Sequence, residues 1–161
     1  MPYYGDLSYN GADEHSGIPM SFTIEQRERD GVPILALNGR LVAGDPIEQF
    51  REKLLAMLEK GLSSEIGAVV LDCRQTSYID SSGLGCLVLA HARAMKAAGK
   101  LPIFGLNRRG LELLIVTKLS TVFELYEDEI SAVNSCFPDR AVKRFDILEF
   151  VQRKRAEGAG Q

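Results

Sequence analysis

The sequence is poor in the residues that hold metal ions or build disulfide frameworks. It has only two histidines, His15 and His91, in 161 residues. Its three cysteines, Cys73, Cys86 and Cys136, are odd in number, widely spaced and set in apolar surroundings. Such cysteines are typical of small core residues, and so few imidazoles argue against a histidine-based metal centre. We therefore expect no metal, no cofactor and no disulfide.

The chain also lacks a strong positive charge and a long apolar run. Its formal net charge is −3 and its isoelectric point is about 5.5, which argues against an electrostatic binder of nucleic acid. A basic stretch near the C-terminus is diluted by acidic residues and is typical of a solvated helix face. No apolar run approaches a bilayer span, and residues 1–20 lack the apolar centre of a signal peptide. We expect a cytoplasmic protein that binds neither membranes nor nucleic acid.

What the sequence does have is the length and composition of one globular domain. Hydrophobic residues make up 45% and charged residues 25% of the chain, which is ordinary for a soluble domain with a real core. Residues 1–20 show no period, and we expect a mobile tail there; a native start at Met20 stays open. We expect the domain to span residues 21–137 and a helical extension with a polar tail to span residues 138–161.

Alternating strand and helix patterns predict a mixed β-sheet of the α/β class. Residues 22–41 predict a hairpin, because Asp30 and Gly31 favour a tight turn between two strand patterns. Three later apolar runs, in "AVVLDC", "LPIFGL" and "TVFELY", predict short buried strands. The expected order is β-β-α-β-α-β-α-β-α with an added helix. An N-terminal hairpin thus opens a sheet that four helices back, and an extra helix follows at the C-terminus.

The helix patterns also indicate ends and buried faces. We expect Asp45 to cap the first helix, with Pro46 at its first position and Glu48 completing a capping box. Gly61 is expected to end it, and the second helix to begin near Asp80. The residues at helical spacing, which we expect to face the core, are Ile47, Phe50, Leu54 and Leu58 in the first helix, Leu84, Leu87, Val88, His91 and Met95 in the second, and Leu111, Leu114 and Ile115 in the third.

The stretch "YIDSSGLG", residues 78–85, places two serines where a predicted strand leads into a helix, and α/β folds place sites at such ends. A serine hydrolase would need a G-x-S-x-G elbow and a base. His15 falls in the expected tail, and His91 lies about ten residues into the helix, roughly 15 Å away. A nucleotide loop would need G-x-x-x-x-G-K-S/T or G-x-G-x-x-G, but the stretch has one lone G-x-G with no lysine behind it. The residues therefore do not indicate an enzyme.

Two interpretations of the serines stay open from the residues alone. One is that a serine receives a phosphate. Free N–H groups at the helix N-terminus favour a dianion, whereas Asp80 repels it, so the charge changes by almost two units without necessarily unfolding the helix. The other is that Ser81 and Ser82 merely cap the helix while Gly83 and Gly85 allow close packing.

The segments "LDCRQTSYIDSSGLGCLVLAHARAMKAAGK" and "LPIFGLNRRGLELLIVTKLSTVFELYEDEISAV" strongly resemble the bacterial anti-sigma factor antagonists of the STAS domain family. The resemblance spans about Phe22 to Phe137. Its most specific part is "VVLDCRQTSYIDSSGLG", supported by the ending "TKLSTVFELYEDE". The resemblance implies a hairpin-led mixed sheet backed by helices, the fold that the patterns predict independently.

The resemblance also implies a partner-switching role. In this family an unphosphorylated antagonist binds a serine-kinase anti-sigma factor and frees the sigma factor that the kinase held. The kinase uses ATP to phosphorylate the antagonist, which dissociates, and a serine phosphatase resets it. The family's phosphoacceptor corresponds to Ser81. The resemblance further implies Asp80 as helix cap and local electrostatic partner, and Ser82 as a secondary capping hydroxyl.

The partner surface implied by the resemblance surrounds this motif. Many members carry an aspartate soon after the G-x-L that closes the second strand. Here Val42 holds that place and the acid is delayed to Asp45, which we include in the surface. The expected partner-binding residues are Tyr78, Ile79, Asp80, Ser82, Gly83, Leu84 and Asp45.

Two other functions compete with the switch. One is a STAS interaction module in a stress-signalling scaffold or a lipid-transport complex, favoured by Val42 and by the added C-terminal helix. The other is a weak nucleotidase, for which a base, a metal set and a phosphate loop are lacking. The C-terminal helix has Val142, Phe145, Leu148 and Val151 close to one face. Packing on its own domain is our expectation, and a homodimer or a partner stays open.

Overall fold

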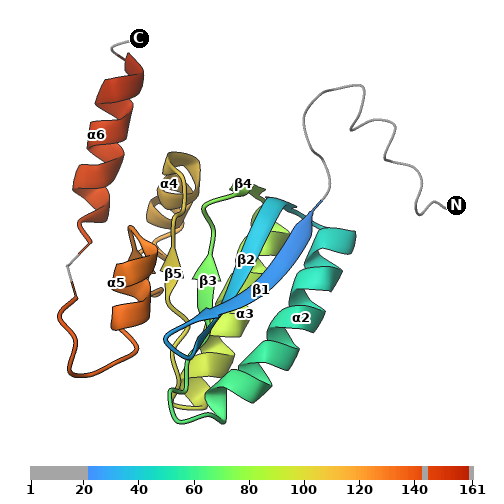
Figure 1. Cartoon of the computed structure of the whole chain (residues 1–161). Coiled ribbons are helices and arrows are strands. Elements are labelled where there is room, and N and C mark those ends of the chain that lie inside the picture. Colours follow the sequence, from blue (N-terminus) through green and yellow to red (C-terminus); the bar gives the residue numbers. More distant parts are fainter. Residues whose placement is uncertain (1–21, 143–144, 160–161) are drawn as a thin grey trace, which may run out of the picture.

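The computed structural model describes residues 22–142 and 145–159. The expectations of a tail over residues 1–20 and of a start at Met20 lie outside the described residues. Figure 1 shows a sheet with helices on both of its faces. Within the described residues the elements are β1 (Thr23–Arg29), β2 (Val32–Leu41), α2 (Asp45–Leu62), β3 (Val70–Asp72), β4 (Thr76–Ile79), α3 (Ser81–Lys96), β5 (Ile103–Phe104), α4 (Arg108–Val116), β6 (Leu125–Tyr126), α5 (Glu129–Asn134) and α6 (Ile147–Ala159).

The sheet is mixed and opens with the predicted hairpin. β1 pairs antiparallel with β2, and the turn between them uses Asp30 and Gly31, both with positive φ, at 54° and 82°. Such angles match the twist of a two-residue hairpin turn. The strand order is β1-β2-β3-β5-β6, with every pair after the first parallel, and β4 pairs with β2 beside this path. The expected fold is therefore confirmed.

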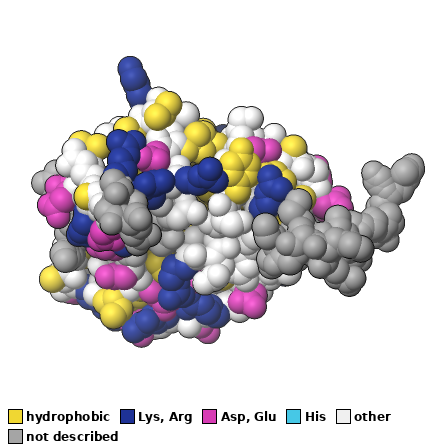
Figure 2. Space-filling view, turned by 90° about the horizontal axis from the view of Figure 1, so that it is seen from above, with side chains coloured by type: hydrophobic (Ala, Val, Ile, Leu, Met, Phe, Trp, Pro, Cys, Tyr) yellow, Lys and Arg dark blue, Asp and Glu magenta, His cyan; other side chains and the backbone are white. Residues whose placement is uncertain are grey.

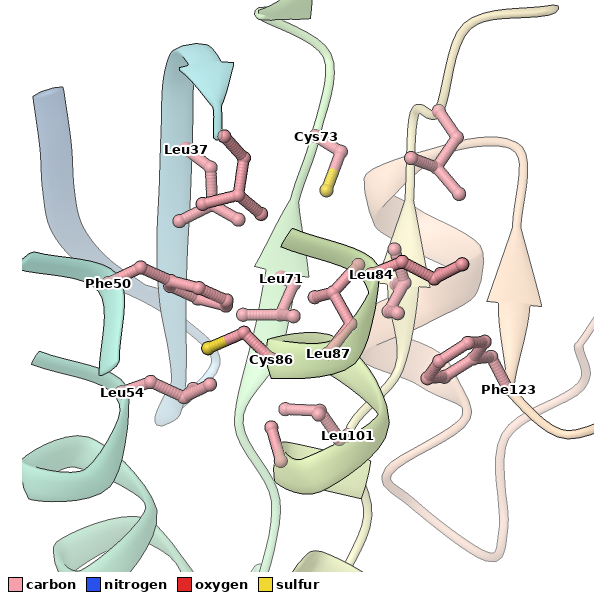
Figure 3. Close-up of a cluster of buried hydrophobic side chains, with 14 of the residues drawn as sticks. Leu37, Phe50, Leu54, Leu71, Cys73, Leu84, Cys86, Leu87, Leu101 and Phe123 are labelled. Carbon is pink, nitrogen blue, oxygen red and sulfur yellow. The ribbon is translucent and has the colours of Figure 1, made fainter. Parts of the chain in front are cut away.

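Two apolar clusters lie on opposite faces of the sheet, because β2 is buried on both sides. Leu35 and Leu37 face the larger cluster and Val32 and Ile34 face the smaller one. The larger cluster packs α2, α3 and α4 against the sheet (Figure 3). The smaller cluster packs α5 against the other face, through Ala132 and Val133. The side chains that we expected to face the core from α2 are buried, as are Leu111 and Leu114 from α4.

The start of α2 differs from the prediction. Its N-cap residue is Gly44, with φ of 105°, and no side chain caps the helix. Asp45 is the first helical residue and does not cap, so that prediction was wrong. A glycine turn already sets the entry angle of the chain, and Asp45 instead adds negative charge to the first turn, where it complements the helix dipole. The helix also runs one residue past Gly61, to Leu62.

The buried face of α3 includes Leu84 and Leu87, as predicted, but differs from the prediction at two other positions. Val88 and Met95 have exposed fractions of 36% and 56%, so their expected burial was wrong. The buried side instead includes Cys86, Ala90 and Ala94. Counting large apolar residues missed this face because small residues form much of it.

One strand was not expected. β4 lies in what the sequence pattern indicated as a loop between the third strand and α3. Its pairing with β2 shifts register between Gly39 and Arg40, so Thr76 and Tyr78 oppose neighbouring residues. A bulge of this kind breaks the alternation of inward and outward side chains on which strand prediction depends.

Candidate functional site

The two serines lie at the end of the molecule where β4 leads into α3. Asp80 ends the connection, and Ser81 and Ser82 are the first two residues of the helix, both exposed. The sequence placed them after a loop that follows the strand of residues 68–73. The structure places them after the unexpected strand β4, also at a carboxyl end. Figure 2 looks onto the molecule from above this end and shows hydrophobic side chains next to several Lys and Arg side chains.

Asp80 fixes the geometry around the serines. Its Oδ1 accepts a hydrogen bond from the backbone N–H of Gly83 at 2.9 Å, which caps α3 as predicted. Its Oδ2 accepts a second hydrogen bond from the backbone N–H of Ala43 at 3.0 Å. Ala43 lies in the β2–α2 connection, so one carboxylate ties that connection to the start of α3.

The pKa of Asp80 is lowered from its ordinary value. Partial burial by itself would raise the pKa, because it removes water from the charged carboxylate. Hydrogen bonds from the backbone N–H groups of Gly83, Ala43 and Ser82 outweigh that effect, since they stabilise the charged form. Asp80 is therefore a fixed negative charge beside the serines at neutral pH.

Gly83 lets the first turn of α3 lie against the sheet. A Cβ added there would sit 2.4 Å from the carbonyl oxygen of Leu41 and 3.0 Å from Cγ2 of Ile79. Gly85 is different, because nothing lies within 4 Å of a Cβ added there. Close packing therefore explains why position 83 is a glycine, and it does not explain the glycine at position 85.

The hydroxyl groups of the two serines do not contribute to the fold. Among the described residues, neither the Ser81 nor the Ser82 hydroxyl makes a hydrogen bond, and both side chains are exposed. Ser82 contributes its backbone N–H to the Asp80 carboxylate instead.

The structure separates the expected partner-binding residues into an exposed and a buried set. Tyr78 is 43% exposed, with the Arg40 guanidinium 5.2 Å from the centre of its ring, and Asp45 is exposed two residues after Ala43. Ile79 is half-buried, and Gly83 and Leu84 are buried. The sequence pattern missed Arg40 and Ala43, because neither contact leaves a local signal. The exposed residues at this end thus include Tyr78, Ser81, Ser82 and Asp45, and the hydrogen bond from Ala43 to Asp80 holds the β2–α2 connection beside the serines.

The remaining reactive side chains are placed in packing positions. His91 is half-buried, with its ring 5.5 Å from that of Phe123 in an edge-on contact. Burial raises the pKa of the Cys73 thiol to about 12 and also raises those of Cys86 and Cys136, which keeps them protonated. Over residues 22–142 and 145–159, no three His, Cys, Asp or Glu side chains are grouped as metal ligands. In the same ranges, every helix is too short or too polar to cross a membrane.

Comparison with known proteins relates this arrangement to one family. The STAS domain model matches residues 23–132. An anti-sigma-B factor antagonist from Listeria monocytogenes is 30% identical over 118 residues, which cover 72% of this chain and 98% of the relative.

Solved structures share the fold at lower sequence identity. An anti-sigma factor antagonist from Mycobacterium paratuberculosis aligns with a TM-score of 0.63 and 20% identity, covering 73% of this chain and 96% of that one. The Bacillus cell fate determinant SpoIIAA in its phosphorylated form aligns with a TM-score of 0.53 and 19% identity, covering 71% and 98%. These two likenesses show the fold.

Proposed function

Because this chain belongs to the STAS domain family and, within it, to the anti-sigma factor antagonists, we propose that it is a cytoplasmic partner-switching protein without enzymatic activity. Unphosphorylated, it binds a serine-kinase anti-sigma factor. The kinase phosphorylates Ser81, the complex dissociates, and a serine phosphatase restores the binding form. The observation that carries this proposal is an exposed hydroxyl at Ser81, the first residue of α3, beside the fixed carboxylate of Asp80.

The geometry supports a phosphate on Ser81 that changes how a partner protein binds this surface. The Asp80 carboxylate already accepts hydrogen bonds from the N–H groups of Ser82 and Gly83. A phosphate on Ser81 would compete with Asp80 for those donors and add up to two negative charges next to it. A partner surface matched to a single carboxylate there would meet up to three negative charges, which opposes binding.

The fold supports a switch that leaves the domain intact. Gly83 and Leu84 anchor the first turn of α3 against the sheet, while the Ser81 side chain faces solvent. Negative charge in the first turn of a helix is favourable to the helix dipole, which offsets repulsion by Asp80. The related structure of SpoIIAA in a phosphorylated form has the same fold.

The test is binding to the serine kinase that co-purifies with the unphosphorylated protein from native cells. We expect Ser81→Asp to weaken binding at least about tenfold and Ser81→Ala to stay bound. Ser63→Asp, an exposed serine just after α2, is the matched control and should bind normally. Phosphosite mass spectrometry on the native protein should find phosphate on Ser81. Equal binding by all three variants would contradict the proposal.

A scaffold module is the second candidate, favoured by α6, which lies beyond the residues that the family model matches. It would bind its partners, or a second copy of itself, without a phosphate switch. An unmodified Ser81 across growth and stress, with partner binding unchanged by Ser81→Asp, would favour this candidate.

A further inference from the structure

A groove of about 380 Å³ runs between β4 and α4. Figure 1 shows the two elements side by side at one end of the sheet. Neither serine of the candidate switch lines the groove. β4 forms one wall and α4, along its whole length, forms the other. The aliphatic lining comes from Ile79, Leu106, Leu113 and Val116.

The strand that forms one wall has an open edge. Among the described residues, β4 pairs with β2 and with no strand on its other side. On the groove side, the carbonyl of Thr76 accepts a hydrogen bond of 3.4 Å from Nδ2 of Asn107, a side chain that also lines the groove. One backbone carbonyl of β4 thus already faces the groove and accepts a donor from across it. Open strand edges bind extended peptides by adding a strand.

The groove lining carries one arginine and one glutamate, and they differ in whether they are paired. Arg109 is exposed, lines the groove and makes no ion pair with a described residue. Glu112, the acidic residue of the lining, is held by Arg108 at 3.9 Å and by Arg155 of α6. Because Glu112 is already paired, Arg109 and the nearby N-terminus of α4 leave a net attraction for an anionic group.

We propose that this groove is a docking site for an extended peptide segment of a partner protein that pairs with the free edge of β4 and carries an acidic side chain opposite Arg109. The backbone of the segment supplies hydrogen bonds to β4, and an apolar side chain covers Leu113 and Val116. The open edge favours a peptide over a small anion, since a small anion would use Arg109 and leave the strand edge unpaired. The groove shares Tyr78 with the surface around Ser81, but its peptide contacts do not use either serine.

The test uses the full-length ¹⁵N-labelled protein and synthetic pentapeptides with blocked ends. Each carries glutamate at position 1, valine at positions 3 and 5 and threonine between them, so that glutamate and valine point to the same side. We expect amide shifts confined to residues 76–79 and 107–116. A lysine-for-glutamate peptide should bind at least about tenfold more weakly, and a backbone N-methylated peptide should not bind. Arg109→Glu should weaken the acidic peptide similarly, whereas the exposed Arg93→Glu on α3 serves as control and should not.

Three results would overturn the proposal. Absence of shifts at millimolar peptide would show that the groove takes no acidic strand. Equal binding of the N-methylated peptide would show a site for side chains or small anions. Shifts centred on residues 80–85 would place the peptide on the serine surface instead.

Discussion

The two glycines of the serine motif have opposite surroundings at the level of single atoms. A Cβ on Gly83 would overlap the Leu41 carbonyl, whereas a Cβ on Gly85 would meet nothing. Both lie in α3 without positive φ, so an alanine is conformationally acceptable at each. Comparing an alanine at position 83 with an alanine at position 85 therefore measures the effect of packing separately from the effect of backbone conformation.

We expect Gly83→Ala to lower the free energy of unfolding by about 1–3 kcal/mol, as an overpacked contact does. Gly85→Ala, its matched control, should raise it by about 0.5–1 kcal/mol through helix propensity. Urea unfolding followed by circular dichroism measures both. Similar values for the two variants would mean that the start of α3 does not depend on close approach to Leu41.

Two aspartates show what a sequence can predict at this scale. Asp80 and Asp45 each precede a helical pattern, and both were expected to cap. Asp80 caps, because its extended backbone lets the side chain reach the N–H of Gly83. Asp45 does not, because the chain turns at Gly44, whose φ is 105°. The side-chain pattern is the same in both cases, and the backbone path that decides between them is set by distant contacts.

At the scale of elements, α6 packs on the domain, in agreement with our expectation. Val151 is 3% exposed and belongs to the larger core cluster. Arg155 pairs with Glu112 of α4. Leu148, which the pattern placed on the same face, is 60% exposed. The domain boundary near residue 138 stays a prediction. Wherever the boundary lies, α6 contributes Val151 to the core.

Val151→Ala should lower the free energy of unfolding by about 1–3 kcal/mol, because it removes buried methyl groups and leaves a cavity. Leu148→Ala should change it by no more than about 0.5 kcal/mol, as expected for an exposed site. Chemical unfolding of both full-length variants tests this. A neutral Val151→Ala would indicate that α6 is only loosely attached to α4.

The order of the elements could be predicted, and some of their details could not. Long periodic segments such as α2 are recognisable because many residues repeat the same pattern. β5 and β6 are only two residues each, shorter than the apolar runs that contain them. β4 was missed because its bulge removes the alternation. The open edge of β4, and hence the groove beside it, followed from no pattern in the sequence.

At the scale of the whole molecule, one ionic cluster joins the hairpin, the central sheet and α5. Arg27 of β1 pairs with Asp72 of β3 and with Glu129 of α5. Arg29 and Arg74 complete the cluster around the same two carboxylates. Burial alone would raise the pKa of Asp72, but hydrogen bonds from Arg74 and Arg27 leave it lowered. The hydrogen bond from Arg27 lowers the pKa of Glu129.

Because both carboxylates have lower pKa values in the folded than in the unfolded chain, their contribution is complete at neutral pH. It should begin to fall once the pH drops to the ordinary values, 4.5 for Glu129 and 3.8 for Asp72, and should be lost as the pH passes below their lowered pKa values in the folded chain. We expect Glu129→Gln to cost about 1–2 kcal/mol at neutral pH, and the difference from wild type to shrink towards pH 3. Urea unfolding at a series of pH values measures it.

Glu127→Gln is the matched control, since Glu127 forms an exposed ion pair with Arg153 at 3.5 Å. Its effect should stay within about 0.5 kcal/mol at every pH. A Glu129→Gln effect that does not diminish in acid would show that the cluster acts through packing and not through charge.

The same cluster has a consequence for biosynthesis. Arg27 and Glu129 are 102 positions apart in sequence, and the ribosome delivers the N-terminal residues first. The edge strand β1 is therefore made early, while the carboxylate that pairs with both of its arginines is made about a hundred residues later. Until then the hairpin lacks both of its ion pairs with Glu129, and contacts of such long range slow folding. A nascent chain stalled before residue 129 should accordingly remain sensitive to proteases within β1, and release of α5 should protect it.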